Sequence, residues 1–202
     1  MLEFNISRPT LREAVRILES EGLITVRRGA RGGAKVQEPS AAVAARYAGL
    51  VLQHRNVDLD DVLTARVVVE APAARTLAAR RDRVTSANRL QACLDSFQRG
   101  GASRFHEFNA LVVELAGNET LVLLTAMLEH ISQLATMSFM MEHHPEEQSL
   151  ARSAQRARQK LIDHIRAGDA EAADRLWRAH LSESGRWLTK GSGAATIVDL
   201  YG

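Results

Sequence analysis

The sequence is poor in cysteine, in aromatic residues and in long apolar runs. A single cysteine among 202 residues, Cys93, excludes an internal disulfide framework and fits a reducing compartment. Aromatic residues make up only 4% of the chain, so a core must be built mainly from aliphatic side chains. No apolar run reaches the roughly 18 residues that a membrane span requires, and no secretory signal opens the chain. We therefore expect a cytoplasmic protein without a membrane partner.

Hydrophobic residues nevertheless make up 46% of the chain, and Ala, Leu, Arg and Glu are abundant, a composition that favours helices. Apolar residues recur at helical spacing in seven segments: 40–54, 57–81, 84–99, 102–116, 119–143, 148–167 and 169–188. The breaks between them are short, and several contain glycine. This pattern predicts a mainly all-α fold, with an antiparallel bundle of about seven helices.

The first 38 residues have a different pattern. Ser7 is suited to cap a helix that Gly22 ends. Residues 23–28 and 34–37 then read as two strands joined by a glycine-rich turn at 29–33. We predict three parts, namely a partial winged helix-turn-helix over 1–38, a helical domain over 39–190 and a flexible tail over 191–202.

The excess positive charge lies in the same N-terminal region. Residues 1–38 carry seven Lys/Arg and five Asp/Glu, whereas residues 39–202 carry nineteen of each. Arg8, Thr10 and Arg12 lie near the start of the predicted helix, where a helix-turn-helix protein reads the major groove. Alone they suit an ordinary solvated face. The arginine- and glycine-rich hairpin tip that follows favours contact with DNA, because glycine permits close approach and arginine binds phosphate or the minor groove.

Three stretches of the N-terminal region are distinctive, namely residues 7–14 (SRPTLREA), residues 18–24 (LESEGLI) and the Arg/Gly-rich hairpin. Together they resemble the recognition helix and wing of GntR-family transcriptional regulators. The resemblance implies a homodimer that contacts operator DNA through Arg8, Thr10, Arg12, Arg28, Arg31 and Gly32. In that family one complete helix and most of a second precede the position of Ser7, whereas only Met1–Asn5 precede Ile6 here. Either the start of the sequence is misplaced or cut, or the winged domain is vestigial.

Several polar residues of the predicted bundle fall within apolar helical stripes. Arg66 and Glu70 share one such stripe, and the others are His106, Asn109, Arg158 and His180. Polar groups in apolar stripes must be paired or must line a cavity. Two interpretations stay open, a buried Arg66–Glu70 pair and an anion-binding pocket to which four helices contribute.

The motifs around these residues resemble the FCD effector domain of the FadR branch. They are Leu63-x-x-Arg66-x-x-x-Glu70, Phe105-His106, Ala116-Gly117-Asn118, Ile165-Arg166-Ala167-Gly168-Asp169 and Ala179-His180-Leu181. In many relatives an Asp and three His hold a metal ion that receives the carboxylate of an organic acid. Here two of those positions are Ala102 and Arg158, which leaves His106 and His180, too few for a divalent metal. We therefore expect no metal cofactor.

In that arrangement Arg158 takes the place of the metal and binds a small anionic metabolite directly, through two parallel hydrogen bonds to its carboxylate. The expected effector-binding residues are Arg66, His106, Asn109, Arg158 and His180. The sequence contains neither a Glu-x-x-His pair nor a His-Glu-x-x-His motif, so we do not expect an enzyme. The predicted function is a ligand-responsive transcriptional regulator. The alternative is a sensor or dimerisation protein without autonomous DNA binding, because the winged domain is incomplete.

Overall fold

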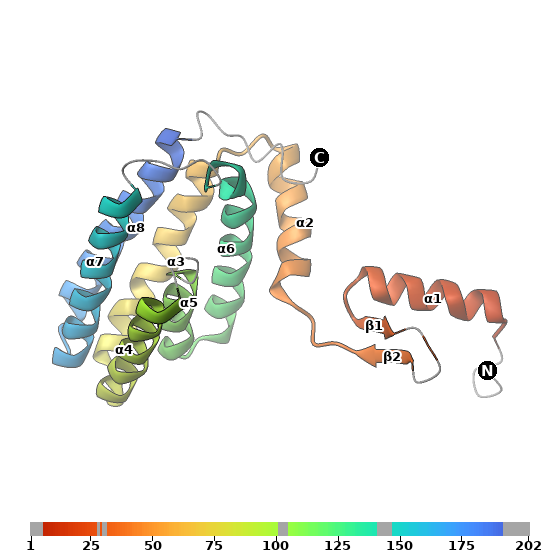
Figure 1. Ribbon diagram of the computed structural model, residues 1–202, viewed down its shortest axis with the longest axis horizontal. Coiled ribbons are helices and arrows are strands. Elements are labelled where there is room, and N and C mark those ends of the chain that lie inside the picture. The colour runs from red at the N-terminus through yellow and green to blue at the C-terminus, as the bar shows by residue number, and fades with distance from the viewer. Residues whose placement is uncertain (1–5, 28, 30–31, 101–104, 141–146, 192–202) are drawn as a thin grey trace.

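The computed structural model describes residues 6–27, 29, 32–100, 105–140 and 147–191, arranged as eight helices and one two-stranded sheet (Figure 1). The elements are α1 (Arg8–Ser20), β1 (Ile24–Arg27), β2 (Gly33–Val36), α2 (Ala41–His54), α3 (Leu59–Ala79), α4 (Arg83–Gly100), α5 (Phe105–Ala116), α6 (Glu119–Met140), α7 (Glu147–Ala167) and α8 (Ala170–Gly191). The two strands are antiparallel, and their register pairs Ile24 with Val36 and Arg27 with Gly33.

Side-chain caps and left-handed glycines set the ends of the helices. The hydroxyl of Ser7 accepts a hydrogen bond of 3.2 Å from the backbone N–H of Thr10, which satisfies one of the free donors at the start of α1. Gly117 and Gly168, with φ of 84° and 80°, end α5 and α7 in a conformation that a side chain disfavours. The residues after them, Asn118 and Asp169, accept backbone hydrogen bonds and thereby start the next helices.

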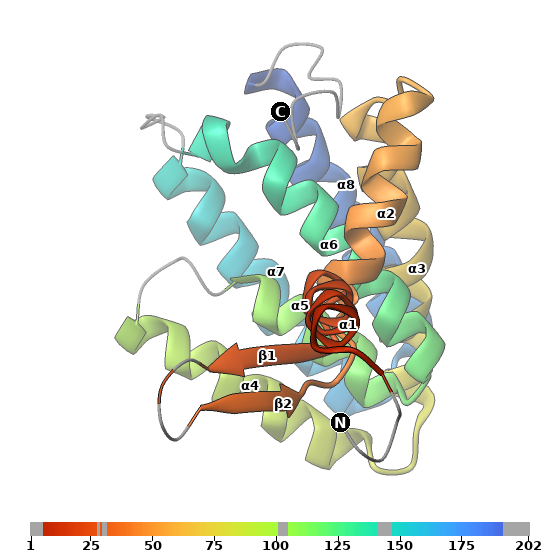
Figure 2. The same cartoon turned by 90° about the vertical axis from the view of Figure 1, so that its right-hand side faces the viewer.

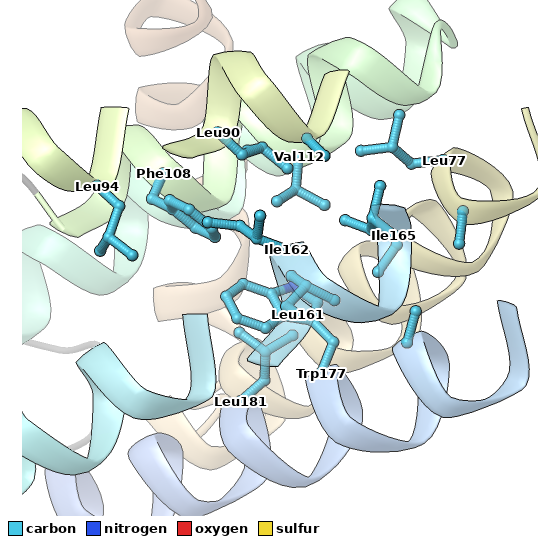
Figure 3. Packing of buried hydrophobic residues seen from close by; sticks show 14 residues of the cluster. Leu77, Leu90, Leu94, Phe108, Val112, Leu161, Ile162, Ile165, Trp177 and Leu181 are labelled. Atoms are coloured by element: carbon cyan, nitrogen blue, oxygen red, sulfur yellow. The ribbon is translucent and has the colours of Figure 1, made fainter. Parts of the chain in front are cut away.

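The main core lies between α3, α4, α5, α7 and α8, and Figure 3 shows its packing. Trp177 and Phe108 are fully buried, and their ring centroids lie 5.9 Å apart in a tilted arrangement. Aliphatic residues fill the remaining space, among them Leu77, Leu90, Val112, Leu161, Ile162 and Ile165. Because α3 contacts α5, α6, α7 and α8, the side chains on its buried face reach the centre of the bundle.

Helix α2 lies at the edge of the bundle between α6 and the N-terminal segment, and α1 and the hairpin stand beyond it (Figures 1 and 2). One face of α2 packs on the bundle through a small cluster of Ala45, Val62 and Ile131. Its first half meets the turn after α1, where the Tyr47 hydroxyl donates to the Glu21 carboxylate at 3.0 and 3.1 Å from the two oxygens. In the N-terminal segment itself no residue of α1 is buried.

The sequence-based prediction of the fold class is confirmed, since the seven helices of the bundle and the hairpin are present at the expected places. Their bounds differ from the prediction by three residues or fewer among the residues that the structure describes. The start of the segment predicted at 102–116, the end of the one predicted at 119–143 and residues 192–202 of the predicted tail lie outside the described residues. No helix in the described part of the chain is long and apolar enough to span a membrane.

The close packing of Gly22 against Val43 leads to a prediction about the stability of the junction between α1 and α2. Gly22 has a φ of 69°, and a Cβ there would lie 2.9 Å from Val43 Cγ2. We expect Gly22→Ala to lower the opening free energy of the last turn of α1 by about 1–3 kcal/mol, as measured by amide hydrogen exchange. Val43→Ala combined with Gly22→Ala should recover the steric part of this loss and leave the cost of the positive φ. Unchanged protection in Gly22→Ala would show that this contact does not hold the junction.

Candidate functional site

A cavity of about 90 Å³ opens inside the bundle, where α3, α5, α7 and α8 meet. Its polar lining residues are two arginines, one asparagine, one histidine and one serine, and leucines provide the apolar wall. The lining residues are Leu63, Arg66, Asn109, Arg158, His180, Leu181, Ser184, Gly185 and Leu188. Gly185 packs against Leu63, and a Cβ at this position would make an ordinary contact of 3.4 Å with Leu63 Cβ.

Four of the five residues that the sequence singled out for an effector pocket line this cavity: Arg66 from α3, Asn109 from α5, Arg158 from α7 and His180 from α8. The fifth, His106, does not. Its side chain is exposed and is not among the lining residues, so its expected place on a buried face is wrong. The reason is that His106 lies in the first turn of α5, whereas the buried face of that helix begins with Phe108 and Asn109.

Arg66 is held in a network of hydrogen bonds between α3 and α6. Its Nε donates to Glu70 Oε1 at 2.8 Å, one terminal nitrogen donates to Glu129 Oε2 at 2.8 Å, and the other donates to Ser132 Oγ at 3.3 Å. Burial disfavours the charge of Arg66, but the two carboxylates outweigh it, so its pKa is raised. Burial also raises the pKa of Glu70, whose side chain is fully buried. The expected Arg66–Glu70 pair therefore exists, and Arg66 also belongs to the cavity wall.

Arg158 brings a second positive charge to the cavity. Its side chain is 5% exposed, and its guanidinium carbon lies 5.8 Å from the centroid of the Phe108 ring. Burial lowers the pKa of Arg158 to about 10, which leaves the side chain protonated at neutral pH. A charged, planar guanidinium in a half-enclosed site is suited to bind a carboxylate through two parallel hydrogen bonds.

His180 and Asn109 provide the neutral polar groups. Burial and then the nearby charge of Arg158 lower the pKa of His180 to about 4, so its imidazole is neutral at pH 7. The ring packs beside Trp177 with the centroids 5.0 Å apart. Asn109 donates a hydrogen bond from Nδ2 to Glu70 Oε2 at 3.4 Å. Its Oδ1 is buried and accepts no hydrogen bond from the residues that the structure describes.

These residues do not fit a divalent metal ion. Of the groups that line the cavity, only the His180 imidazole is a strong ligand for a transition metal, and the guanidinium of Arg158 repels cations. No three His, Cys, Asp or Glu residues gather at a metal-binding distance within the described parts of the chain. Ala102, which the resemblance places at the position of the missing aspartate, lies outside the described residues.

The N-terminal segment presents exposed basic side chains on α1. Arg8, Thr10 and Arg12 are exposed along its first half. The Thr10 hydroxyl lies 2.7 Å from that of Ser7, so it belongs to the helix cap. In the hairpin Gly32 is exposed and donates from its backbone N–H to the Gly29 carbonyl. Arg28 and Arg31 lie outside the described residues.

The residues that sequence analysis missed are those that complete the network and the walls. Glu129 and Ser132 lie on α6, where their sequence neighbours gave no signal that they face Arg66. Ser184 and Gly185 follow His180 by about one turn of α8, so helical periodicity from that residue would have found both.

The chain begins with a helix and a hairpin that expose basic side chains and continues with an all-helical domain that contains a buried cationic cavity. This arrangement is typical of a DNA-binding regulator with a ligand-binding domain. The model of the FCD domain matches residues 61–183, and that of the gntR family of bacterial regulatory proteins matches residues 1–34. The chain belongs to the GntR-family regulators with an FCD domain. Both families consist of regulators and not of enzymes.

Solved structures of other proteins resemble this chain, and two of them are described here. A GntR protein from Streptococcus agalactiae is 20% identical, with a TM-score of 0.61 over 92% of this chain and 84% of that chain, and it supports the fold. The Lar protein, described as controlling the agr system of Listeria monocytogenes and mediating virulence, is 14% identical, with a TM-score of 0.49 over 93% of this chain and 82% of that chain. No curated protein matches the sequence.

The buried imidazole of His180 predicts a loss of stability in acid. Its pKa is 6.5 in an unfolded chain and about 4 here, so the unfolded state binds the proton first as the pH falls. The stability that a neutral His180 provides is fully present above pH 6.5 and is lost between pH 6.5 and 4. It amounts to about 3 kcal/mol at most. We expect His180→Gln to flatten the free energy of unfolding over this range, as measured by urea denaturation, whereas the exposed control His54→Gln should not. An unchanged slope in His180→Gln would contradict the assignment.

Proposed function

We propose that this protein is a cytoplasmic, homodimeric transcriptional regulator whose cavity binds a small carboxylate metabolite through Arg158. The observation that carries the proposal is the buried, charged guanidinium of Arg158 in a cavity whose described lining contains no carboxylate. The seven helices from α2 to α8 are the number expected for the FadR branch, which supports a place in that branch.

The two arginines of the cavity have different contacts, and this difference supports an anionic ligand. All three nitrogens of Arg66 already donate to Glu70, Glu129 and Ser132, so this residue keeps α3 and α6 together. Arg158 comes from α7, on another side of the cavity, and faces the neutral imidazole of His180. A carboxylate bound there gains charge-assisted hydrogen bonds in a partly desolvated site. No metal ion takes part in this arrangement.

The exposed basic residues of α1 support DNA binding at the other end of the chain. In this proposal Arg8 and Arg12 contact bases or phosphates in the major groove. Arg28 and Arg31, which lie outside the described residues, are proposed from the sequence alone to contact phosphate or the minor groove. A two-fold dimer would place two such segments on the half-sites of a palindromic operator. The ligand would change operator affinity by shifting the population of helix arrangements that fix the distance between these segments.

The first test of this function is ligand binding. We expect small carboxylates to raise the melting temperature of the full chain, because a ligand that binds only the folded state stabilises it. Arg158→Ala should abolish this rise, while Arg152→Ala, an exposed arginine on the same helix, should leave it unchanged. EDTA should not alter the melting temperature or the effect of the carboxylate. A stoichiometric metal that is required for binding would refute the metal-free site.

The second test is operator binding, measured by fluorescence anisotropy against DNA selected from a random library. Arg8→Ala or Arg12→Ala should cost about 1–3 kcal/mol if the side chain reads a base, or reduce the salt slope by about 1 if it binds phosphate. Arg175→Ala, an exposed arginine on α8, is the control. If affinity and salt dependence stay unchanged in both α1 variants, the assignment of α1 to DNA recognition is wrong.

A further inference from the structure

A groove of about 400 Å³ lies between α3 and α8, next to the buried cavity, and several exposed residues in its wall show that it opens to solvent. Its lining residues are Asp60, Leu63, Thr64, Val67, Leu181, Ser182, Gly185 and Arg186. Leu63, Leu181 and Gly185 also line the cavity. Because the two hollows share these three residues, a single layer of side chains separates them.

The order of the residues around α8 shows how the two hollows lie. Residues four apart form three adjacent rows along the helix, which are His180 and Ser184, Leu181 and Gly185, and Ser182 and Arg186. The first row lines only the cavity, the third lines only the groove, and the middle row lines both. Successive residues are rotated by about 100° around a helix axis, so the middle row stands between the hollows. On α3, Leu63 has the same position, between Arg66 on the cavity side and Thr64 on the groove side.

The layer between the two hollows is thinnest at Gly185. This residue lies inside α8, where glycine makes a helix less stable than alanine does. A Cβ there would make an ordinary contact of 3.4 Å with Leu63 Cβ, so the packing of α3 on α8 does not require glycine. The missing side chain instead leaves space beside Leu63 and Leu181. Leucine side chains can change rotamer in such a space without movement of the backbone.

The sides of the cavity that face the bundle are closed more firmly. Arg66 is tied to α6 by hydrogen bonds, and Arg158 and His180 stand against the buried rings of Phe108 and Trp177. A molecule that entered from these sides would have to break the hydrogen-bond network or cross the core. Passage from the groove requires only the rotation of side chains.

We propose that small molecules reach the cavity through this groove, and that Leu63 and Leu181, opposite Gly185, form the gate that they pass. The inference rests on the proposed function in that the cavity receives a molecule from solvent, but it concerns the path and not the kind of molecule. A path changes the barrier to entry and exit and not the equilibrium between them. The groove therefore controls how fast the cavity exchanges its occupant and leaves the affinity unchanged.

Alkylation of a thiol inside the cavity measures entry directly. The full chain carries Cys93→Ala, which removes the native thiol, and Asn109→Cys, which places a thiol on the α5 side of the cavity, away from the groove. The thiolate displaces iodide from iodoacetamide, a small neutral reagent, and mass spectrometry follows the thioether that forms. His180→Cys takes the place of Asn109→Cys where circular dichroism shows that the latter does not fold.

Three variants of the groove and the gate give the expected results. Ser182→Phe fills the groove without lining the cavity, and we expect it to slow alkylation about 10-fold, as a modest increase of the barrier would. Gly185→Ala should also slow alkylation, and it should raise the melting temperature by about 1–4 °C because alanine favours the helix. Leu181→Ala should speed alkylation, since the gate loses one of its two side chains.

Two control variants separate a blocked path from other effects. Thr85→Phe adds the same ring to an exposed position of α4 and should leave the rate unchanged. Leu90→Ala weakens the core away from the groove and should also leave the rate unchanged, because entry through the gate does not require unfolding. Faster alkylation in Leu90→Ala would show that the thiol is reached by unfolding, and the gate would then be wrong.

The path and the proposed function fail separately. Unchanged alkylation in Ser182→Phe would overturn the path and indicate entry past Ser184 and Leu188, the half-buried part of the cavity lining outside the groove. The stabilisation by carboxylates through Arg158 would be untouched by that result. Slower alkylation in Ser182→Phe in a chain that no carboxylate stabilises would confirm the path and contradict the proposed ligand.

Discussion

The pairing of one largely buried arginine organises the ligand-binding half of this protein. Arg66 enters a largely apolar interior, where an uncompensated charge would cost several kcal/mol. Two carboxylates and a hydroxyl compensate it, and they come from its own helix and from α6. The geometry of the guanidinium group thus fixes the distance between α3 and α6. It also directs one oxygen of Glu70 towards Asn109 and thereby orients that amide.

This network gives the two arginines of the cavity different surroundings. The charge of Arg66 is neutralised by groups of the protein itself, and its removal would leave a buried carboxylate. Arg158 lies against an aromatic ring and a neutral imidazole, and burial lowers its pKa without removing its charge. The two guanidinium groups that line the cavity are therefore stabilised in different ways, Arg66 mainly by the carboxylates of Glu70 and Glu129.

Much of the fold could be predicted from the sequence because its helices are long, periodic and separated by glycine-containing breaks. Polar residues inside apolar stripes also identified four of the nine residues that line the cavity, since burial forces such groups to meet one another or a ligand. The pattern failed for His106, because sequence periodicity does not show which helical turn the neighbouring helices cover. It also could not identify Glu129 and Ser132. Which helix lies opposite Arg66 is a matter of tertiary packing, and no local spacing encodes it.

Helix α2 contacts both the helical bundle and the turn after α1, so it connects the two halves of the chain. Its inner face rests on Ile131, which lies between Glu129 and Ser132, the residues on α6 that hold Arg66. A few residues along, Tyr47 and Val43 touch the turn that ends α1. Helices α6 and α2 thus connect the cavity wall to the basic segment. Under the proposed function, a displacement of α6 on ligand binding would reach α1 through α2, and the stiffness of α2 would then set how strongly the regulator responds.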